Sequence, residues 1–241
     1  MRGLKAFLRR VLGADQEEER LHATFNAVVA KEGCLSGARG AWLDIACRDG
    51  VSTARLLHAV AEAASPDHSR AQGPRLVVGV DVSAAYLAKA CQRFPCVRAD
   101  IERADWPFRS GVAGCVVMNQ LLEHLKDPFH TLGEADRILR VGGILLLGVP
   151  NLAGFVNRLH LLLGRQPPAI HFPGPHVCGF TWGSFLAFLQ SNNNFKILRA
   201  CGACRYPLPP PISEWAGRLV PSCASYMFVI ARKVADEIVT A

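Results

Sequence analysis

The sequence contains no apolar run of the eighteen or so residues that a membrane-spanning helix needs. Its first residues lack the long apolar segment and the small-residue cleavage site that are typical of a secretory signal. Internal repeats and low-complexity segments are missing too. Half of the 241 residues are hydrophobic, so the chain can build a core of its own. We therefore expect a folded, cytoplasmic protein.

The cysteines of the sequence do not suggest a disulfide framework. The nine cysteines are odd in number, which favours reduced thiols over paired ones. Most stand in apolar contexts where we expect burial: Cys47, Cys91, Cys115 and Cys223. One CxxC pair, Cys201 with Cys204, has no second ligand pair at a common zinc spacing. We expect no metal ion.

The basic residues are in modest excess, for a formal net charge of +7, and they are spread along the chain. An excess of this kind is usually a solubility feature. The densest group lies in residues 3–12, which have the period of an amphipathic helix. We expect this helix to dock on the domain. Peripheral contact with a membrane surface is the alternative.

From residue 41 to 150, apolar strands alternate with helices. The expected strands are 41–45, 75–81, 96–100, 111–119 and 142–150, and the expected helices are 51–64, 83–94 and 127–139. This order predicts a mostly parallel sheet covered on both faces. Two later strands, 195–206 and 225–233, can add an antiparallel edge. We expect a helical extension at 1–34, a main domain at 35–241 and a substrate lid within 151–215.

Polar side chains end the first four predicted strands. Asp44, Asp81 and Asp100 close three strands in succession, and Asn119 closes the fourth. Ligands of open parallel sheets bind beyond the carboxyl ends of the strands. Three consecutive aspartates at that edge predict a site for a ligand with several hydrogen-bond donors.

The ordered segments LDIACRDG, VVGVDVS, VRAD, VVMNQLLEHLKDP and LRVGGILLLGVPN resemble the class I S-adenosylmethionine-dependent methyltransferases. The resemblance covers residues 41–151 and implies an α/β, Rossmann-like, doubly wound sheet of seven strands with an antiparallel edge strand. It also implies S-adenosyl-L-methionine as cofactor. The Glu-His pair after the fourth strand is similar to a branch that methylates small molecules, quinones, lipids and glycans.

The resemblance implies a role for each cofactor residue. The turn built from Asp44, Ala46, Cys47, Arg48 and Gly50 passes its backbone beside the methionine part of the cofactor. Asp81 accepts from the ribose hydroxyls, and Val82 packs on the adenine.

At the next strands, Asp100 accepts from the adenine amine, and the Ile101 amide lies near a ring nitrogen. Asn119 and Gln120 lie beside the sulfonium and its amino-acid tail.

Arg48 is the serious departure from the family pattern Asp-x-Gly-x-Gly-x-Gly. If this position needs φ > 0, an arginine is strained there by about 1–2 kcal/mol. If φ is negative and the side chain points away, the cost is small, and the guanidinium can then reach the cofactor carboxylate. The sequence leaves both conformations open.

Glu123 and His124 are expected on the substrate side, with His124 as the candidate general base. His171 and His176, from a proline-rich loop, are candidate substrate contacts and equally candidate structural residues. We expect no metal at the Glu-His pair, although some relatives in this branch hold one there.

Several motifs of rival functions are missing. A nicotinamide dehydrogenase needs G-x-G-x-x-G, of which only Gly50 remains. Amino-methylating nucleic-acid enzymes carry Asn/Asp-Pro-Pro-aromatic after the fourth strand, where this chain has Asn119-Gln120-Leu121-Leu122. The missing motifs argue against a nucleic-acid acceptor, and the resemblance implies a small-molecule, lipid or glycan acceptor. The remaining alternative is a degenerate methyltransferase fold that binds the cofactor or serves as a partner subunit.

Overall fold

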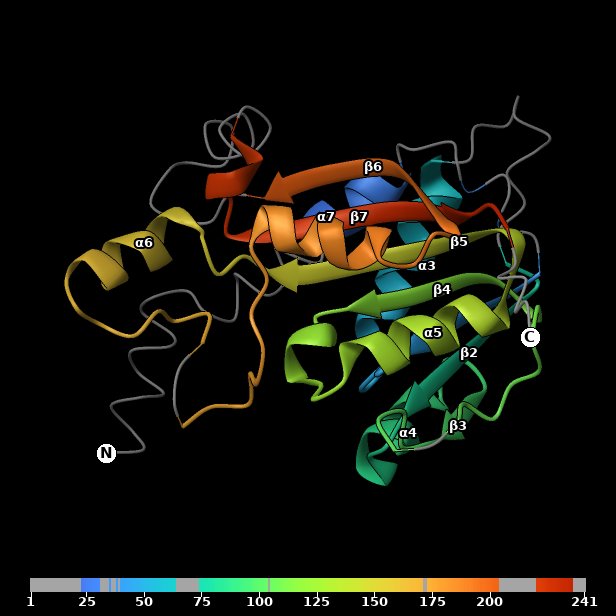
Figure 1. Cartoon of the computed structure of the whole chain (residues 1–241). Coiled ribbons are helices and arrows are strands. Elements are labelled where there is room, and N and C mark those ends of the chain that lie inside the picture. The colour runs from blue at the N-terminus through green and yellow to red at the C-terminus, as the bar shows by residue number, and fades with distance from the viewer. Residues whose placement is uncertain are drawn as a thin grey trace.

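The computed structural model describes residues 23–30, 35, 38, 40–63, 74–103, 105–170, 173–203 and 220–235. A seven-stranded sheet crosses the molecule in the order β3-β2-β1-β4-β5-β7-β6 (Figure 1). Its strands are β1 (Ala41–Ile45), β2 (Leu76–Asp81), β3 (Cys96–Arg98), β4 (Ala113–Asn119), β5 (Leu139–Pro150), β6 (Phe195–Ala203) and β7 (Tyr226–Lys233). This is the predicted Rossmann-like α/β fold.

The first five strands run parallel to one another. Helical or loop crossovers connect them, as parallel pairing requires. The reversed strand is β7, which pairs antiparallel with β5 on one side and with the edge strand β6 on the other. The carboxyl ends of the parallel strands therefore meet at one edge of the sheet, where the site was predicted.

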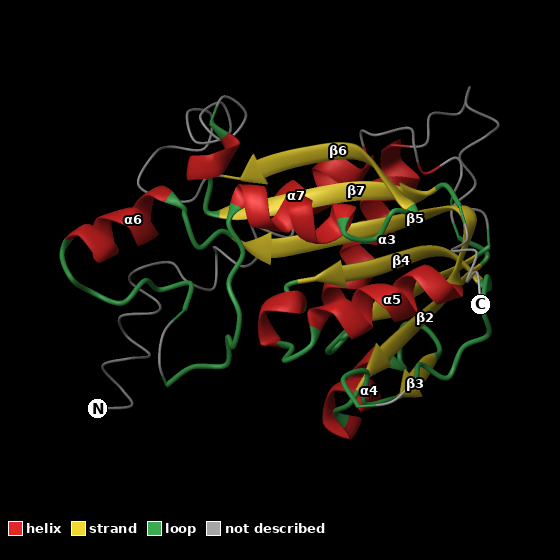
Figure 2. Cartoon of the chain, viewed as in Figure 1, coloured by secondary structure: helices red, strands yellow, loops and turns green. Residues whose placement is uncertain are grey.

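Helices cover both faces of the sheet (Figure 2). The described ones are α3 (Val51–Ala63), α4 (Ala84–Ala90), α5 (Pro128–Ile138), α6 (Phe155–Leu162) and α7 (Trp182–Gln190), with 3₁₀ turns η2 (Leu122–His124) and η3 (Pro221–Cys223). Three of these helices are capped by side chains: Ser83 and Thr181 accept from backbone N–H groups of α4 and α7, and Asp127 caps α5 ahead of Pro128.

The core has a layer on each face. One layer joins α5 and α7 to the sheet through residues such as Leu132, Ile138 and Phe185. The other joins α3 and the helical residues 23–30 to the opposite face through Phe25 and Leu56. Burial of these apolar side chains fixes the sheet, and with it the geometry of the loops at its edge.

Several element boundaries differ from the sequence prediction by a few residues, and the difference at β5 has a structural cause. The strand expected to begin at residue 142 begins at Leu139, and Gly142, with φ 82°, lies inside it. The pairing passes from Ala113–Leu139 to Cys115–Ile144, so the two glycines form an irregularity within the strand. A glycine pair that looks like a strand start is here a bulge.

Among the described residues of the predicted lid, 151–170 and 173–203, only part stands away from the sheet. Helix α7 and strand β6 pack as members of the fold, whereas α6 projects beyond the sheet edge (Figure 1). The projecting helix carries exposed apolar side chains, among them Leu162, which is 84% exposed.

The amphipathic segment 3–12 and most of the predicted extension 1–34 lie outside the described residues. In the part of the chain that the structure describes, no helix has the length and apolar character to cross a membrane.

The seven cysteines in the described residues are not joined to one another by disulfides. Cys47 and Cys115 are buried as predicted, but Cys91 is exposed, because it follows the last turn of α4 on the solvent side. Cys201 lies in β6 and Cys204 lies outside the described residues.

Candidate active site at the carboxyl edge of the sheet

The turn after β1 has a left-handed backbone at every second residue. The φ values are 62° at Ala46, 53° at Arg48 and 77° at Gly50. At Gly50 a residue with a side chain would collide with Phe94, since a Cβ there would lie 2.7 Å from the Phe94 ring. The turn thus adopts a glycine-type conformation although two glycines are replaced. The left-handed φ of Arg48 carries a conformational strain of about 1–2 kcal/mol.

Asp44 lies beneath this turn, near the end of β1, and is 8% exposed. Burial raises the pKa of Asp44 to about 7; a hydrogen bond from the Thr53 hydroxyl opposes the rise and the nearby charge of Asp81 adds to it. A buried carboxyl of this kind favours a cationic ligand, which would stabilise its charged form.

Asp81, at the end of β2, is held by two backbone N–H groups. Arg48 N donates to Oδ2 at 3.0 Å and Ser83 N donates to Oδ1 at 2.8 Å. Each carboxylate oxygen keeps a further lone pair. The next residue, Val82, is 57% exposed and offers an apolar surface beside the carboxylate. This arrangement can accept two hydroxyls and support a flat ring.

The Arg48 side chain lies over a neighbouring element. Its guanidinium carbon is 5.6 Å from the centre of the Tyr86 ring on α4, within cation–π range. The residue is exposed and contributes a positive charge at an edge otherwise lined by carboxylates. It can therefore meet the carboxylate of a ligand.

Cys47 faces the other way. Its thiol packs with Phe94 and against Gly79, where a Cβ would lie 2.7 Å from the sulfur. Burial raises the pKa of the Cys47 thiol far above its usual range. Only the backbone of Cys47 remains for a ligand at this turn.

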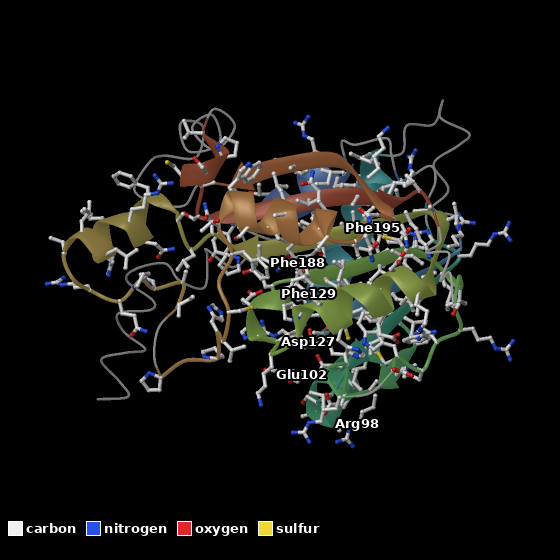
Figure 3. The ribbon with its side chains drawn as sticks, viewed as in Figure 1. Arg98, Glu102, Asp127, Phe129, Phe188 and Phe195 are labelled. Atoms are coloured by element: carbon white, nitrogen blue, oxygen red, sulfur yellow. The ribbon has the colours of Figure 1, made fainter. Side chains whose placement is uncertain are left out.

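The loop after β3 carries Asp100, whose Oδ1 accepts from Glu102 N at 3.2 Å. Ile101 is half-buried, and its carbonyl accepts from the Trp106 indole at 3.2 Å. Glu102 in turn accepts from Lys126 N at 2.6 Å, so the loops after β3 and β4 are tied together near Asp127 (Figure 3).

At the end of β4, Gly148 on the adjacent strand leaves room for the Asn119 side chain, because a Cβ there would collide with Asn119 Oδ1. Gln120 has φ 57°, and its N–H donates to Gly148 O at 2.7 Å. These contacts turn the chain sharply at the strand end and set up the 3₁₀ turn that follows.

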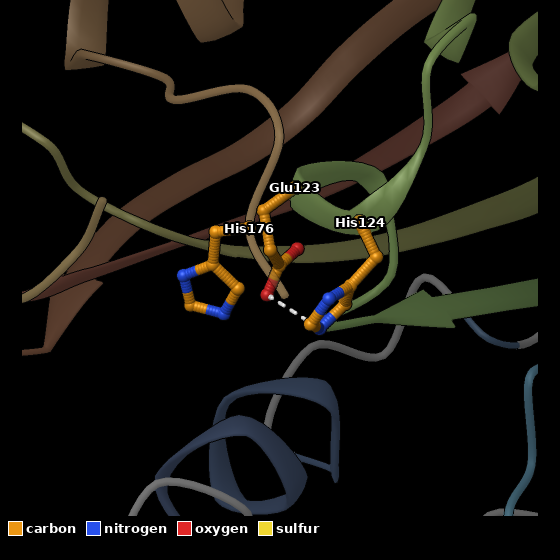
Figure 4. Close-up of side chains that lie close together, drawn as sticks. All are labelled: Glu123, His124 and His176. Atoms are coloured by element: carbon orange, nitrogen blue, oxygen red, sulfur yellow. Dashed lines mark ion pairs between the residues drawn. The ribbon is translucent and has the colours of Figure 1, made fainter. Parts of the chain in front are cut away.

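That turn presents Glu123 and His124. Glu123 is 2% exposed, and burial raises its pKa to about 8. The pKa of His124 is lowered, mainly by burial, with the charges of His176 and Arg48 contributing against the hydrogen bond to Pro175. The rings of His124 and His176 lie edge to face, 4.8 Å apart (Figure 4).

Backbone contacts bring His176 to this turn. The N–H groups of Val177 and Cys178 donate to Glu123 O at 2.8 and 3.2 Å, and the Cys178 thiol donates to Leu122 O at 3.1 Å. An apolar groove of about 420 Å³ begins on the far side of Cys178, between α5 and α7, where Phe129 and Phe188 meet (Figure 3).

The structure thus brings the predicted residues of β1, β2 and β4 to one edge and adds His176 to them. His171 lies outside the described residues. Sequence reasoning missed Thr53, Tyr86 and Cys178. Tyr86 was visible as an aromatic residue in the first turn of the predicted helix 83–94, whereas no pattern pointed to the hydrogen bond of Thr53.

Comparisons with known proteins agree with this geometry. Residues 43–147 match the model of a family described as a methyltransferase domain. A probable S-adenosylmethionine-dependent methyltransferase of Mycolicibacterium smegmatis is 36% identical over 97 residues, which are 39% of this chain and 35% of the relative. The chain matches about a third of the length of such curated relatives.

Solved structures share the fold over nearly the whole chain. An S-adenosylmethionine-dependent methyltransferase from Thermotoga maritima superposes with a TM-score of 0.60 at 15% identity, covering 94% of this chain and 98% of that one. An N-methyltransferase from Bradyrhizobium japonicum, in complex with S-adenosylhomocysteine, gives 0.56 at 16% identity, covering 90% and 87%. Residues 43–147 are therefore similar to methyltransferase domains, and the chain has the Rossmann-like fold that S-adenosylmethionine-dependent methyltransferases share.

Proposed function

We propose that the edge formed by Asp44, Arg48 and Asp81 binds S-adenosylmethionine, and that the chain transfers its methyl group to a small-molecule, lipid or glycan acceptor. The observation that carries the proposal is the pair of backbone hydrogen bonds on Asp81, from Arg48 N and Ser83 N. They aim a buried carboxylate at the position that a nucleoside ribose takes in doubly wound folds.

Charge supports the same ligand. S-adenosylmethionine carries a sulfonium, an ammonium and a carboxylate. Asp44 and Asp81 place two buried carboxyls at the edge of a chain whose formal net charge is +7. The ammonium fits Asp44, which gains an opposite charge, and the ligand carboxylate fits the exposed guanidinium of Arg48.

The adenine would lie on Val82, with its amine toward Asp100 and its ring nitrogen toward the Ile101 amide. The sulfonium would then lie near Asn119 and Gln120, at the end of β4. No atom of the chain has to form a covalent bond in this reaction.

The proposed chemistry is an in-line displacement. A lone pair on oxygen, nitrogen or carbon of the acceptor forms the new bond to the methyl carbon while the carbon–sulfur bond breaks, leaving S-adenosylhomocysteine. Alignment of the three atoms supplies most of the acceleration. The acceptor proton is lost to solvent or to a base. We propose His124 as that base: its Nδ1 lies 3.2 Å from Pro175 O, and a proton on Nδ1 would leave the Nε2 lone pair to accept.

The lipid acceptor class has some physical support. The groove between α5 and α7 is lined mainly by apolar groups, and α6 exposes Phe155, Leu159 and Leu162 beside the same sheet edge. A contact of residues 3–12 with a membrane surface would bring such an acceptor within reach.

One observation favours a second function, a cofactor-binding or partner subunit without turnover. Arg48 has φ 53° in a turn that is built for glycine, and its side chain lies on the cofactor side, over Tyr86. If the guanidinium occupies the methionine position, binding is weakened and catalysis lost.

The test is turnover with S-adenosylmethionine carrying a labelled methyl group, with separate small-molecule, lipid, glycan and nucleic-acid extracts as acceptors. We expect S-adenosylhomocysteine, with label recovered in one of the first three extracts. Asp81→Asn should abolish the signal, and Asp105→Asn, at an exposed carboxyl away from the edge, should not. Cofactor binding without turnover in any extract would favour the partner-subunit function.

A further inference from the structure

Helix α6 carries its apolar side chains on the outside of the molecule. With about 3.6 residues per turn, four apolar residues of the helix and its C-cap fall within about 120° of the helix circumference. They are Phe155, Val156, Leu159, Leu162 and the C-cap Leu163, and their exposed fractions run from 37% at Val156 to 84% at Leu162. A surface helix of a globular domain normally turns its apolar stripe toward the core. The polarity of α6 is the reverse.

A buried asparagine fixes this orientation. Asn157, on the opposite side of α6, donates from Nδ2 to Asn151 O at 2.8 Å. Its Oδ1 accepts from Ala169 N at 3.4 Å. Arg158 adds a bond from Nε to Ala153 O at 2.6 Å. These polar contacts hold the helix to the rest of the chain while its apolar face points outward.

The sequence that contains α6 carries charge of one sign. Residues 137–213 contain no Asp or Glu, although the whole chain has 20 of them. By helical spacing, Arg158 and His160 flank the apolar face on its two sides, and Arg165 follows the helix. Both arginines are exposed. An apolar helix face with basic side chains beside it is typical of helices that lie in the interface of a membrane, and the charge is complementary to anionic lipid.

A second copy of the chain fits this face less well. An eight-residue helix is about 12 Å long and about 10 Å wide, far less than the roughly 800 Å² that each partner of a specific protein interface contributes. Two copies would also bring the same arginines, Arg158 and Arg165, toward each other. A bilayer has no such area requirement, because each inserted apolar side chain adds its own transfer free energy.

We propose that α6 is an interfacial anchor, which inserts its apolar face into the headgroup boundary of a membrane containing anionic lipid, with Arg158 and Arg165 at the lipid phosphates. This places the membrane contact on α6, whereas the sequence pattern suggested residues 3–12. Helix α6 follows β5 at the carboxyl edge of the sheet, so the anchor holds that edge close to lipid (Figure 1). The anchor stands without the proposed function; only delivery of a lipid acceptor to the methyl-donor site rests on it.

The experiment is flotation of the full chain with lipid vesicles, in the absence of S-adenosylmethionine. One set of vesicles is phosphatidylcholine alone, and the other is phosphatidylcholine mixed with phosphatidylglycerol. We expect binding to the mixed vesicles at low salt, weaker binding to phosphatidylcholine alone, and release from the mixed vesicles as the salt concentration rises, because salt screens the arginines.

Two variants locate the contact. Leu162→Asp should weaken binding to the mixed vesicles by at least about tenfold, because an inserted leucine is replaced by a charge of the wrong sign. Arg165→Glu should weaken it by about fivefold or more at low salt, with a smaller difference at high salt.

Each variant has a matched control at the opposite edge of the sheet. Val141→Asp places the same charge at an exposed apolar residue near the start of β5. Lys196→Glu makes the same charge reversal near the start of β6. Both controls should bind the mixed vesicles nearly as the unmodified chain does.

Thermal unfolding checks that each variant folds, and Leu163→Asp takes the place of Leu162→Asp if the latter does not. Absence of binding to the mixed vesicles overturns the proposal. So does equal binding to both kinds of vesicle without salt dependence, or a loss in Val141→Asp as large as in Leu162→Asp.

Two further outcomes would assign the contact elsewhere and also overturn the proposal. Binding that Leu8→Asp abolishes and Leu162→Asp retains would assign it to residues 3–12. A dimer in sedimentation that Leu162→Asp dissociates, without vesicle binding by the unmodified chain, would assign the face to a second copy. Absence of S-adenosylmethionine binding, measured separately by titration, with intact vesicle binding contradicts only the proposed function.

Discussion

The backbone N–H of Arg48 donates a 3.0 Å hydrogen bond to Asp81 Oδ2, linking the turn after β1 to the end of β2. Arg48 makes this bond while holding a left-handed φ of 53°. A residue that looked incompatible with the glycine turn thus keeps the backbone geometry on which the proposed ribose contact depends.

Arg48→Gly should raise the free energy of unfolding by about 0.5–1 kcal/mol. Relief of the strained φ adds about 1–2 kcal/mol to the stability of the folded chain. The greater freedom of glycine in the unfolded chain lowers the stability by about 0.4–1 kcal/mol. Urea unfolding measures the difference. Arg48→Ala keeps the strain and should not show the gain. A loss of stability in Arg48→Gly would mean that the contact with Tyr86 outweighs the strain.

The buried Asp44 predicts a pH dependence of stability. Its pKa is about 7 in the folded chain against 3.8 ordinarily, so between these values the folded state holds a proton that the unfolded state has lost. The contribution of Asp44 is therefore greatest at low pH and is lost as pH rises through about 7.

The corresponding variant is Asp44→Asn, which keeps an oxygen for the Thr53 hydroxyl. From about pH 5 to about pH 8, the stability of the variant relative to the unmodified chain should rise, as measured by urea unfolding at each pH. Asp105→Asn, at an exposed carboxyl, serves as the control. A difference that does not change with pH would show that Asp44 is ionised throughout this range.

A buried polar network predicts the largest loss of stability. Lys233 Nζ, on β7, donates to Asp136 O at 2.8 Å and Leu139 O at 3.1 Å and lies 3.2 Å from Asp136 Oδ1. Lys233→Met should lower the free energy of unfolding by about 3–5 kcal/mol, because it leaves a buried carboxylate without its cation. Lys196→Met, on the exposed side of β6, should change it little. Equal effects would contradict this assignment.

Two glycines with opposite surroundings form a matched pair. Gly148→Ala would press a methyl group onto Asn119 and to 3.0 Å from the Phe228 ring, and should destabilise by about 1–3 kcal/mol while weakening cofactor binding. Gly133→Ala, within α5 and with nothing within 4 Å of the new methyl, should stabilise by about 0.5–1 kcal/mol. Calorimetric unfolding of both variants tests the pair, and a reversed order would contradict the packing described at Gly148.

The fold could be predicted because the strands of this chain are apolar and bounded by turn residues. Hydrophobic burial acts on patterns a few residues long, and those patterns are visible without coordinates. The aspartates at the strand ends were predictable for the same reason, since the parallel order of the strands brings Asp44 and Asp81 to one edge.

The remaining features depend on contacts between distant segments. The left-handed φ of Arg48 goes together with a hydrogen bond from its N–H to Asp81, a contact between distant segments, and the sequence left that φ open. His176 reaches Glu123 through backbone hydrogen bonds of Val177 and Cys178, which no side-chain pattern encodes. The bulge at Gly142 likewise follows from pairing with β4, and a local pattern reads it as a strand start.

The most direct test of the central claim is isothermal titration of S-adenosylmethionine and S-adenosylhomocysteine into the purified chain, with Asp81→Ala alongside. The account predicts one binding site per chain for both ligands, lost in Asp81→Ala while Lys196→Met binds normally. Absence of binding by the unmodified chain, or equal binding by Asp81→Ala, would contradict the assignment of this sheet edge as the cofactor site.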